Sequence, residues 1–197
     1  MNNIVFIEGV SGVGKTTATT LLSEKLLSIG YKASHYLEGA NNNPLDPYKG
    51  AYPPAMPITE FFEAYLQCWQ NFMEIKFEND FMIVDGALLH HQINDLIRGY
   101  NASDEVITDY LSGLLRIILP LNPIIFYLSS DNVEQSLIQA CKSRNQSTPT
   151  REQINFWENR KRVDLYALEK LPVESHILDV SNGWDSISKT IVAQITM

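Results

Sequence analysis

The sequence predicts an α/β protein in which one parallel sheet is covered by helices on both faces. Short apolar runs alternate with longer amphipathic segments, five of the runs have the length of strands, and three of those are almost continuously hydrophobic. Unbroken apolar strands are typical of a parallel sheet buried on both faces. With 197 residues, 45% of them hydrophobic, we expect a single domain over residues 1–197.

The predicted strands recur at intervals that leave room for helices between them. The strand ranges are Asn3–Glu8, Lys32–Leu37, Phe81–Asp85, Pro123–Leu128 and His176–Val180. The predicted helices are Lys15–Ile29, which Gly30 ends, Thr59–Asn79, a helical region over Leu88–Leu119, Asn132–Lys142, Arg151–Leu171 and a last helix from Trp184. The stretch Gly39–Pro57 is rich in Asn, Pro, Gly and Tyr and indicates a long loop or lid.

Charge and composition exclude several classes of partner. The net charge of -8 and the isoelectric point near 4.9 disfavour nucleic-acid binding, which needs basic surface. The chain enters an apolar run at Ile4, which leaves no room for a signal peptide, and no apolar stretch approaches the roughly 18 residues of a membrane helix. We therefore expect a soluble, cytoplasmic protein without a membrane partner, in which Cys68 and Cys141 are buried thiols.

The strongest motif is GVSGVGKT at Gly9–Thr16, which lies where the first strand gives way to the first helix and matches the Walker A pattern. Its glycines allow main-chain N–H groups to turn toward phosphates at a helix N-terminus. Lys15 is then placed to bridge the β- and γ-phosphates, and Thr16 to bind Mg²⁺. The motif predicts ATP and Mg²⁺ as ligands, held by Gly9, Val10, Ser11, Gly12, Val13, Gly14, Lys15, Thr16 and Thr17.

A second acid near the metal is expected at the end of a neighbouring strand. Asp85 ends the apolar run FMIVD, where an idle buried carboxylate would be costly. We expect Asp85 to serve Mg²⁺ together with Thr16; the alternative is that it caps the next helix. The sequence lacks N-K-x-D and D-x-x-G segments, which counts against a regulatory GTPase. Leu111-Ser112-Gly113 lacks the following Gly-Gln of a transporter signature, which counts against an ABC-type ATPase.

Three segments carry a resemblance to a known family: IEGVSGVGKTT at Ile7–Thr17, Asn122–Leu137 and His176–Ile191. The chain resembles the P-loop nucleoside and nucleotide kinases, and most of all the thymidylate kinase branch. This resemblance implies a three-layer P-loop NTP-hydrolase-type fold with strand order 2-3-1-4-5, and a short lid near residues 142–151. It also implies that Asn182, in the loop after the last strand, passes beside the adenine.

The predicted lid carries Lys142, Arg144 and Arg151 around a polar turn. Mobile cations that close over the γ-phosphate suit phosphoryl transfer, which relies on positioning and electrostatics. We expect Arg144 to be catalytic, and the resemblance implies that it also stacks on adenine. The alternative is a solvated turn in which Thr150 and Gln153 cap the following helix.

The acceptor site is expected beyond the C-terminal ends of the strands. Glu38 follows the second strand, where nucleoside kinases place a Glu that takes the proton of the acceptor hydroxyl; it is our candidate base, and a surface residue is the alternative. Aromatic residues of the next helix offer a flat surface to a ligand, although such stripes are more often core. The candidate acceptor-binding residues are Glu38, Phe62, Tyr65, Trp69, Gln92, Arg98 and Arg151, of which Gln92 and Arg98 come from the resemblance.

The acceptor itself stays open. Asp85 is followed by Gly86-Ala87 instead of the Arg usual in thymidylate kinases, and Glu38-Gly39-Ala40-Asn41 replaces their Arg-Glu-Pro-Gly segment. The expected function is ATP- and Mg²⁺-dependent phosphoryl transfer to a small nucleoside-, nucleotide- or metabolite-type acceptor. The alternatives are a kinase for an antibiotic or other hydroxylated metabolite, and an ATP-binding regulatory protein that recruits a partner through Gly39–Tyr52. A homodimer is also open.

Overall fold

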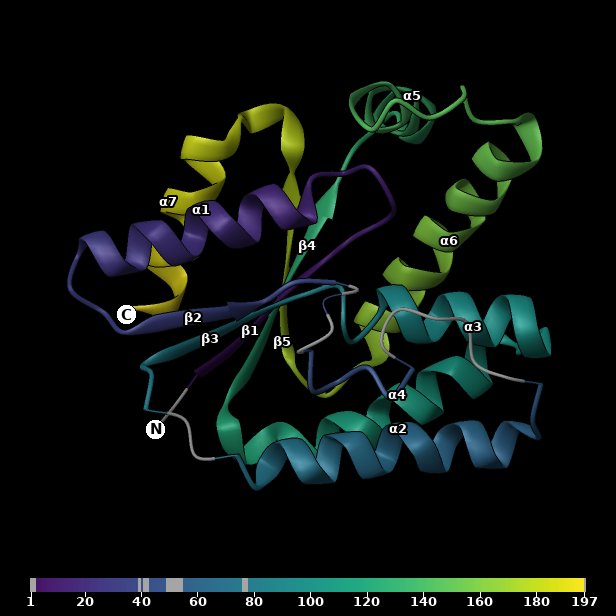
Figure 1. Cartoon of the computed structure of the whole chain (residues 1–197), viewed down its shortest axis with the longest axis horizontal. Helices are drawn as coiled ribbons and strands as arrows, with labels where there is room; N and C mark the ends of the chain where they lie inside the picture. The colour runs from purple at the N-terminus through teal and green to yellow at the C-terminus, as the bar shows by residue number, and fades with distance from the viewer. Residues whose placement is uncertain (1–2, 39, 41–42, 49–54, 76–77, 197) are drawn as a thin grey trace.

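The sheet of the computed structural model contains five parallel strands in the order β2-β3-β1-β4-β5 (Figure 1). The structure describes residues 3–38, 40, 43–48, 55–75 and 78–196. The α/β class and the parallel five-stranded sheet predicted from the sequence are confirmed, and the strand order is the expected one. The strands are β1 Asn3–Glu8, β2 Ala33–Tyr36, β3 Phe81–Asp85, β4 Pro123–Ser129 and β5 Glu174–Asp179.

Alternate side chains of the central strand β1 enter two separate cores. Ile4 and Phe6 belong to the core shared with α2, α3, α4 and the second half of α6, whereas Val5 and Ile7 face α1, α5 and α7. Helices therefore cover both faces of the sheet (Figure 1). The helices are α1 Lys15–Ser28, α2 Ile58–Met73, α3 His90–Tyr100, α4 Asp104–Ile118, α5 Val133–Ser143, α6 Arg151–Lys170 and α7 Trp184–Ile195.

Two helix predictions need correction. The predicted helical region Leu88–Leu119 is two helices, because Asn101 takes a left-handed conformation with φ 48° and ends α3, and the Ser103 side chain accepts from Val106 N to begin α4. The predicted helix Thr59–Asn79 ends at Met73 as α2. Beyond it the Asn79 side chain donates to Ser34 Oγ, so the chain is already turning into the sheet.

The structure also differs from the predictions in strand boundaries and in the burial of the two cysteines. The fifth strand begins at Glu174 because Glu174 pairs with Ile124 of β4. Of the predicted loop Gly39–Pro57, residues 40, 43–48 and 55–57 are described and contain no helix or strand; the remainder of the Gly39–Tyr52 partner segment lies outside the described residues. Cys68 and Cys141 are half-buried rather than buried. No helix in the described part of the chain is long and apolar enough to cross a bilayer.

The C-terminal ends of the parallel strands meet at one edge of the sheet. In the strand register, Asp85 of β3 lies beside Ile7 of β1, and Glu8 of β1 lies beside Tyr127 of β4. The segments that leave these strands, including Gly9–Thr16 and the segment leading into α3, therefore converge at this edge. This convergence places polar groups from distant parts of the sequence close to one another.

Candidate functional site

A cavity of about 750 Å³ lies at this edge of the sheet. It is bounded by the Gly9–Thr16 loop and the start of α1, by the end of α5, and by the first turn of α3. Its volume is within the usual range for small-molecule sites. The described residues that line it are Ser11, Gly12, Gly14, Lys15, Thr16, Thr17, Glu38, His91, Gln139, Ala140, Ser143 and Arg144.

The Gly9–Thr16 loop presents main-chain donors to the cavity. Gly14 is the N-cap of α1 with φ 97°, and it provides no side chain to accept from the first N–H groups of the helix. A Cβ at Gly14 would lie 2.5 Å from Cζ2 of Trp184, so the tryptophan of α7 requires glycine at this position as well. The first N–H groups of α1, which have no side-chain cap, and the helix dipole make this end of the cavity suitable for an anion such as a phosphate.

Lys15 lies at the floor of the cavity, with 6% of its side chain exposed. Its ammonium is 3.4 Å from Val10 O, 3.2 Å from His90 Nδ1 and 3.4 Å from Glu38 Oε2. A buried ammonium requires such partners because its desolvation is costly. Lys15 is thus held between the loop and Glu38, and an anion that entered the cavity would compete with Glu38 for it.

Thr16 and Asp85, the two residues predicted to bind Mg²⁺, lie in direct contact. The Thr16 hydroxyl donates to Asp85 Oδ2 at 2.6 Å, while Asp85 Oδ1 is buried without a hydrogen-bond partner among the described residues. Burial raises the pKa of Asp85, and the charge of Lys15 opposes the rise. No three His, Cys, Asp or Glu side chains of the described chain form a metal site by themselves. Thr16 and Asp85 fit a Mg²⁺ that takes its other ligands from phosphates and water, which is how Mg²⁺ is usually bound.

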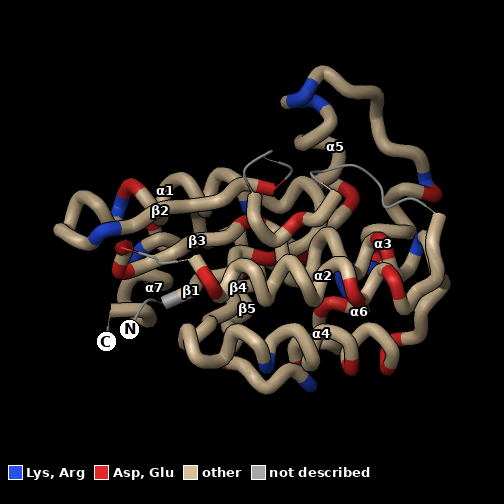
Figure 2. Tube along the Cα trace, turned by 60° about the horizontal axis from the view of Figure 1, so that its bottom comes forward, with Lys and Arg blue, Asp and Glu red and all other residues tan. Residues whose placement is uncertain are grey.

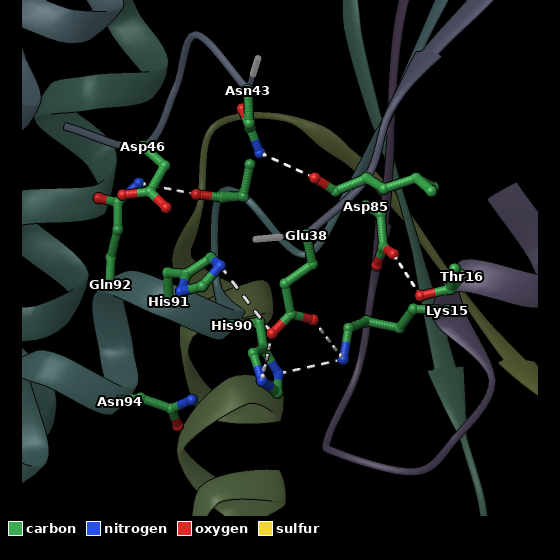
Figure 3. Close-up of polar contacts among 12 residues, drawn as sticks. Lys15, Thr16, Glu38, Asn43, Asp46, Asp85, His90, His91, Gln92 and Asn94 are labelled. Atoms are coloured by element: carbon green, nitrogen blue, oxygen red, sulfur yellow. Dashed lines mark hydrogen bonds and ion pairs between the residues drawn. The ribbon is translucent and has the colours of Figure 1, made fainter. Parts of the chain in front are cut away.

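Glu38 forms the centre of a charged cluster opposite the loop (Figure 3). Its Oε2 faces Lys15, and its Oε1 lies 3.2 Å from Nε2 of His90 and 3.9 Å from Nε2 of His91. The Glu38 side chain is 29% exposed, whereas that of His90 is 6% exposed. Glu38 therefore lines the cavity while its carboxylate contacts the more deeply buried side chains of Lys15 and His90.

Beneath the cluster, Glu8 and Arg160 hold the start of α3. Glu8, at the end of β1, accepts from the main-chain N–H groups of Leu88 and His90, and burial raises its pKa to about 8. Arg160 of α6 is fully buried, donates to the carbonyl oxygens of Leu89 and His90, and pairs with Asp164 at 2.7 Å. The main chain around His90 is consequently fixed from both β1 and α6.

The predicted lid residues occupy different positions. Arg144, at the end of α5, lines the cavity, and Lys and Arg positions gather there (Figure 2). Arg151 is 70% exposed, pairs with Glu134 at 3.7 Å and is not among the described lining residues. The alternative for this turn is also present, because Thr150 and Gln153 form a capping box at the start of α6. Asn182 lies in the short 3-10 helix Val180–Asn182, exposed and outside the described lining.

The predicted aromatic contacts of α2 belong to the core rather than to the cavity lining. Trp69 is fully buried and stacks on Phe6, with ring centroids 5.9 Å apart. Tyr65 is 1% exposed, and its hydroxyl donates to Asp95 at 3.4 Å. Phe62 is half-buried and stacks on Tyr110 at 4.3 Å. The wide apolar stripe of α2 therefore reflects packing, which was the alternative stated for it.

Two further predicted residues, Gln92 and Arg98, also lie outside the described cavity lining. Gln92 is fully buried and donates to Ala87 O at 2.9 Å, with its Oε1 unpartnered among the described residues. The Arg98 guanidinium lies 4.1 Å from the centroid of the Phe156 ring. Its charge is therefore engaged by an aromatic face of α6.

The sequence did not indicate several residues that contribute to the site. Glu8 and Arg160 give no local signal, because an isolated Glu at a strand end and an Arg within a run of cations are common on surfaces. The sequence around His90 shows only a high density of polar residues, and Trp184 was predicted only as the start of a helix. No protein-family model matches the chain, and no curated protein matches its sequence significantly. The residues of the cavity therefore provide the basis for inferring a function.

Proposed function

We propose that this protein is an ATP- and Mg²⁺-dependent kinase that transfers a phosphoryl group to the hydroxyl of a small acceptor. The observation that carries the proposal is the convergence of Lys15, the Thr16–Asp85 pair and Glu38 on one cavity. The assignment to the P-loop kinases, and within them the resemblance to the thymidylate kinase branch, is part of this proposal. It is supported by the strand order and by the Walker A sequence after the central strand.

The donor half of the cavity suits a nucleoside triphosphate. Open N–H groups at the start of α1 would bind phosphate oxygens, and Lys15 would move from Glu38 onto the β- and γ-phosphates. Thr16 and Asp85 would hold Mg²⁺, which when bound neutralises charge on the phosphates. Arg144 would close over the transferred group from the end of α5.

The acceptor half suits a hydroxyl better than a phosphate. Glu38 and His91 line this half, and a carboxylate there would repel an acceptor phosphate. Two cations of the neighbouring helices, Arg98 and Arg160, are engaged by Phe156 and by main-chain carbonyls with Asp164. In the transfer step Glu38 takes the hydroxyl proton, the acceptor oxygen bonds to the γ-phosphorus, and the bond to the ADP oxygen breaks.

A panel of acceptors tests the proposal. Nucleosides, nucleoside monophosphates and other hydroxylated metabolites would be incubated with ATP and Mg²⁺, and ADP release would be measured. We expect acceptor-dependent release with one or more hydroxyl compounds. Lys15→Ala should lower it by about 100-fold or more, since it removes a cation that stabilises the transferred charge. Lys25→Ala, in the last turn of the same helix, is the matched control.

The outcomes separate the candidate functions. Turnover confined to nucleoside monophosphates would contradict the hydroxyl acceptor but keep the kinase. ATP binding without any acceptor-dependent ADP release would contradict the kinase and favour an ATP-binding regulatory protein. Wild-type activity in Lys15→Ala would contradict the proposed nucleotide site itself.

A further inference from the structure

The imidazole of His90 contacts two oppositely charged groups of the cavity, Lys15 and Glu38. Its Nδ1 lies 3.2 Å from Lys15 Nζ and 3.1 Å from Gly9 O, and its Nε2 lies 3.2 Å from Glu38 Oε1 (Figure 3). One ring therefore connects the phosphate-facing loop to the acceptor-facing carboxylate. The neighbouring His91, which lines the cavity, lies at 3.9 Å from the same Glu38 oxygen.

The position of the His90 ring is determined from several sides. Its face stacks on Trp157 of α6, with centroids 5.2 Å apart and an interplanar angle of 15°. Its main-chain N–H donates to Glu8 Oε2, and its carbonyl accepts from Arg160. These main-chain contacts do not depend on the side chain, so a substitution of His90 leaves the start of α3 anchored.

The partners of His90 determine which nitrogen carries the proton. Burial, and then the charges of Lys15 and Arg160, lower the pKa of His90 well below its usual value, so the ring is neutral. A neutral imidazole has one donor and one acceptor nitrogen. The ammonium of Lys15 can only donate, and the carboxylate of Glu38 can only accept.

The Gly9 carbonyl, 3.1 Å from Nδ1, can also only accept, so the ring faces two acceptors and one donor. A proton on Nδ1 would face the Lys15 ammonium and leave the Nε2 lone pair against the Glu38 carboxylate, whereas a proton on Nε2 satisfies both charged partners and opposes only the neutral carbonyl. The proton is therefore assigned to Nε2, which donates to Glu38, and Nδ1 accepts from Lys15.

We propose that His90 is a positioning residue, which holds Glu38 Oε1 through Nε2–H and so leaves Oε2 to receive the proton of the acceptor hydroxyl. The inference rests on the proposed kinase function for its catalytic consequence. When Lys15 turns to the phosphates, Oε2 loses its cation partner while Oε1 stays bound to His90. The Glu38 carboxylate then keeps its orientation at the moment when its outer oxygen becomes accessible.

Two conservative variants separate the two nitrogens. A Gln amide at position 90 reaches the place of Nε2 and retains a donor for Glu38, whereas an Asn amide reaches the place of Nδ1 and retains only the partner of Lys15. We expect His90→Asn to lower kcat about tenfold or more while the Kd for ATP stays within about threefold. His90→Gln should recover kcat to within about threefold of wild type. His176→Gln, which alters a histidine–glutamate pair on β5 with Nε2 2.9 Å from Glu174 Oε1, should change neither quantity.

A spectroscopic measurement tests the same contact without turnover. In protein labelled with ¹⁵N-histidine, the imidazole signals assigned to His90 by their loss in His90→Gln should show the Nε2–H form. Equal losses of kcat in the Gln and Asn variants, or wild-type kcat in both, would overturn the positioning role. An Nδ1–H ring would overturn it as well. If wild type turned over no acceptor, the proposed kinase function would fail, and the tautomer alone would decide the contact between His90 and Glu38.

Discussion

The Thr16 hydroxyl donates a hydrogen bond of 2.6 Å to Asp85 Oδ2, although 69 positions separate the two residues in the chain. The other carboxylate oxygen, Oδ1, is buried and has no hydrogen-bond partner among the described residues. A buried acceptor left open is costly unless a ligand or water completes it. In the proposed function, the pair would provide one hydroxyl and one carboxylate oxygen for the Mg²⁺ of a bound nucleotide.

From this relationship we predict that Asp85→Asn specifically weakens the binding of Mg²⁺. The Mg²⁺ concentration for half-maximal activity at fixed ATP should rise about 10- to 100-fold, because the neutral amide no longer holds the ion or its waters. Titration of Mg²⁺ against ADP release measures the effect. Asp80→Asn, just before the opposite end of β3, is the control, since Asp80 accepts only from Lys32 N in the described contacts. An unchanged Mg²⁺ requirement in Asp85→Asn would exclude this role.

Arg144 and Arg162 are both exposed on the surface. Arg144 lines the cavity, whereas Arg162 lies outside the described lining and pairs with Asp104. We predict that Arg144→Ala lowers kcat at least about tenfold, because the transferred phosphoryl group loses a cation that closes over it. Steady-state kinetics with saturating ATP measure the loss. Arg162→Ala should retain the kcat of wild type, and a similar loss in both variants would indicate a general effect of charge.

Burial of the Arg160–Asp164 pair makes it sensitive to the loss of one partner. Both side chains are 0% exposed, so Asp164→Ala leaves a buried guanidinium without its carboxylate, which we expect to cost about 3–5 kcal/mol of unfolding free energy. Urea unfolding followed by circular dichroism measures this loss. Asp185→Ala removes an exposed carboxylate from the pair with Lys189, which has the same i, i+4 spacing, and should leave the midpoint nearly unchanged. Equal shifts in the two variants would contradict the role of burial.

The raised pKa of Glu8, about 8 against an ordinary 4.5, predicts a pH-dependent stability. The folded state holds the proton more tightly than the unfolded state does. The stabilising contribution is therefore complete below about pH 4.5 and is lost as the pH rises through about 8. Between about pH 6.5, the usual pKa of an unfolded histidine, and pH 8, the loss of this contribution should lower the free energy of unfolding by up to about 1.4 kcal/mol per pH unit.

Glu8→Gln tests this dependence through its slope. Urea midpoints measured at several pH values between about 6.5 and 8 should fall with pH in the wild type and stay nearly level in the variant. The slope is compared rather than the absolute stability, since Gln also replaces an acceptor of His90 N by a donor. Glu134→Gln, a half-exposed residue of α5, should keep the slope of the wild type. A steep slope in Glu8→Gln would assign the titration to another group.

Local chemistry explains why much of the fold and part of the site were predictable. The runs FMIVD at Phe81–Asp85 and PIIFYL at Pro123–Leu128 have too few polar groups to be anything but buried strands. The Gly9–Thr16 loop and the capping box of Thr150 and Gln153 are specified by residues adjacent in sequence. The turn at Asn101–Ser103 had a comparable signal, a Ser before two acids, which the long helical periodicity obscured.

Side-chain orientation was not predictable in the same way. The stripe of α2 contains aromatic residues on adjoining faces, and periodicity cannot tell which of them meet a cavity. Trp69 is buried because its ring meets Phe6 of β1, a contact between residues 63 positions apart. Likewise His90 and His91 are adjacent in sequence, yet His90 is the one that contacts Lys15 and stacks on Trp157. His90 makes these contacts because it lies on the face of α3 that packs against α6, whereas His91 lines the cavity.

The sequence by itself determined the parallel sheet, the glycine-rich Gly9–Thr16 loop and the separate candidates Lys15, Glu38 and Asp85, because strand burial and loop geometry follow from neighbouring residues. Tertiary structure alone decided that Glu38 lies 3.4 Å from Lys15, that His90 joins them, and that Arg160 anchors His90 from α6. The physical reason is that the C-terminal ends of parallel strands meet at one edge of the sheet. Electrostatic and hydrogen-bond contacts among their loops depend on that meeting, and sequence spacing does not encode it.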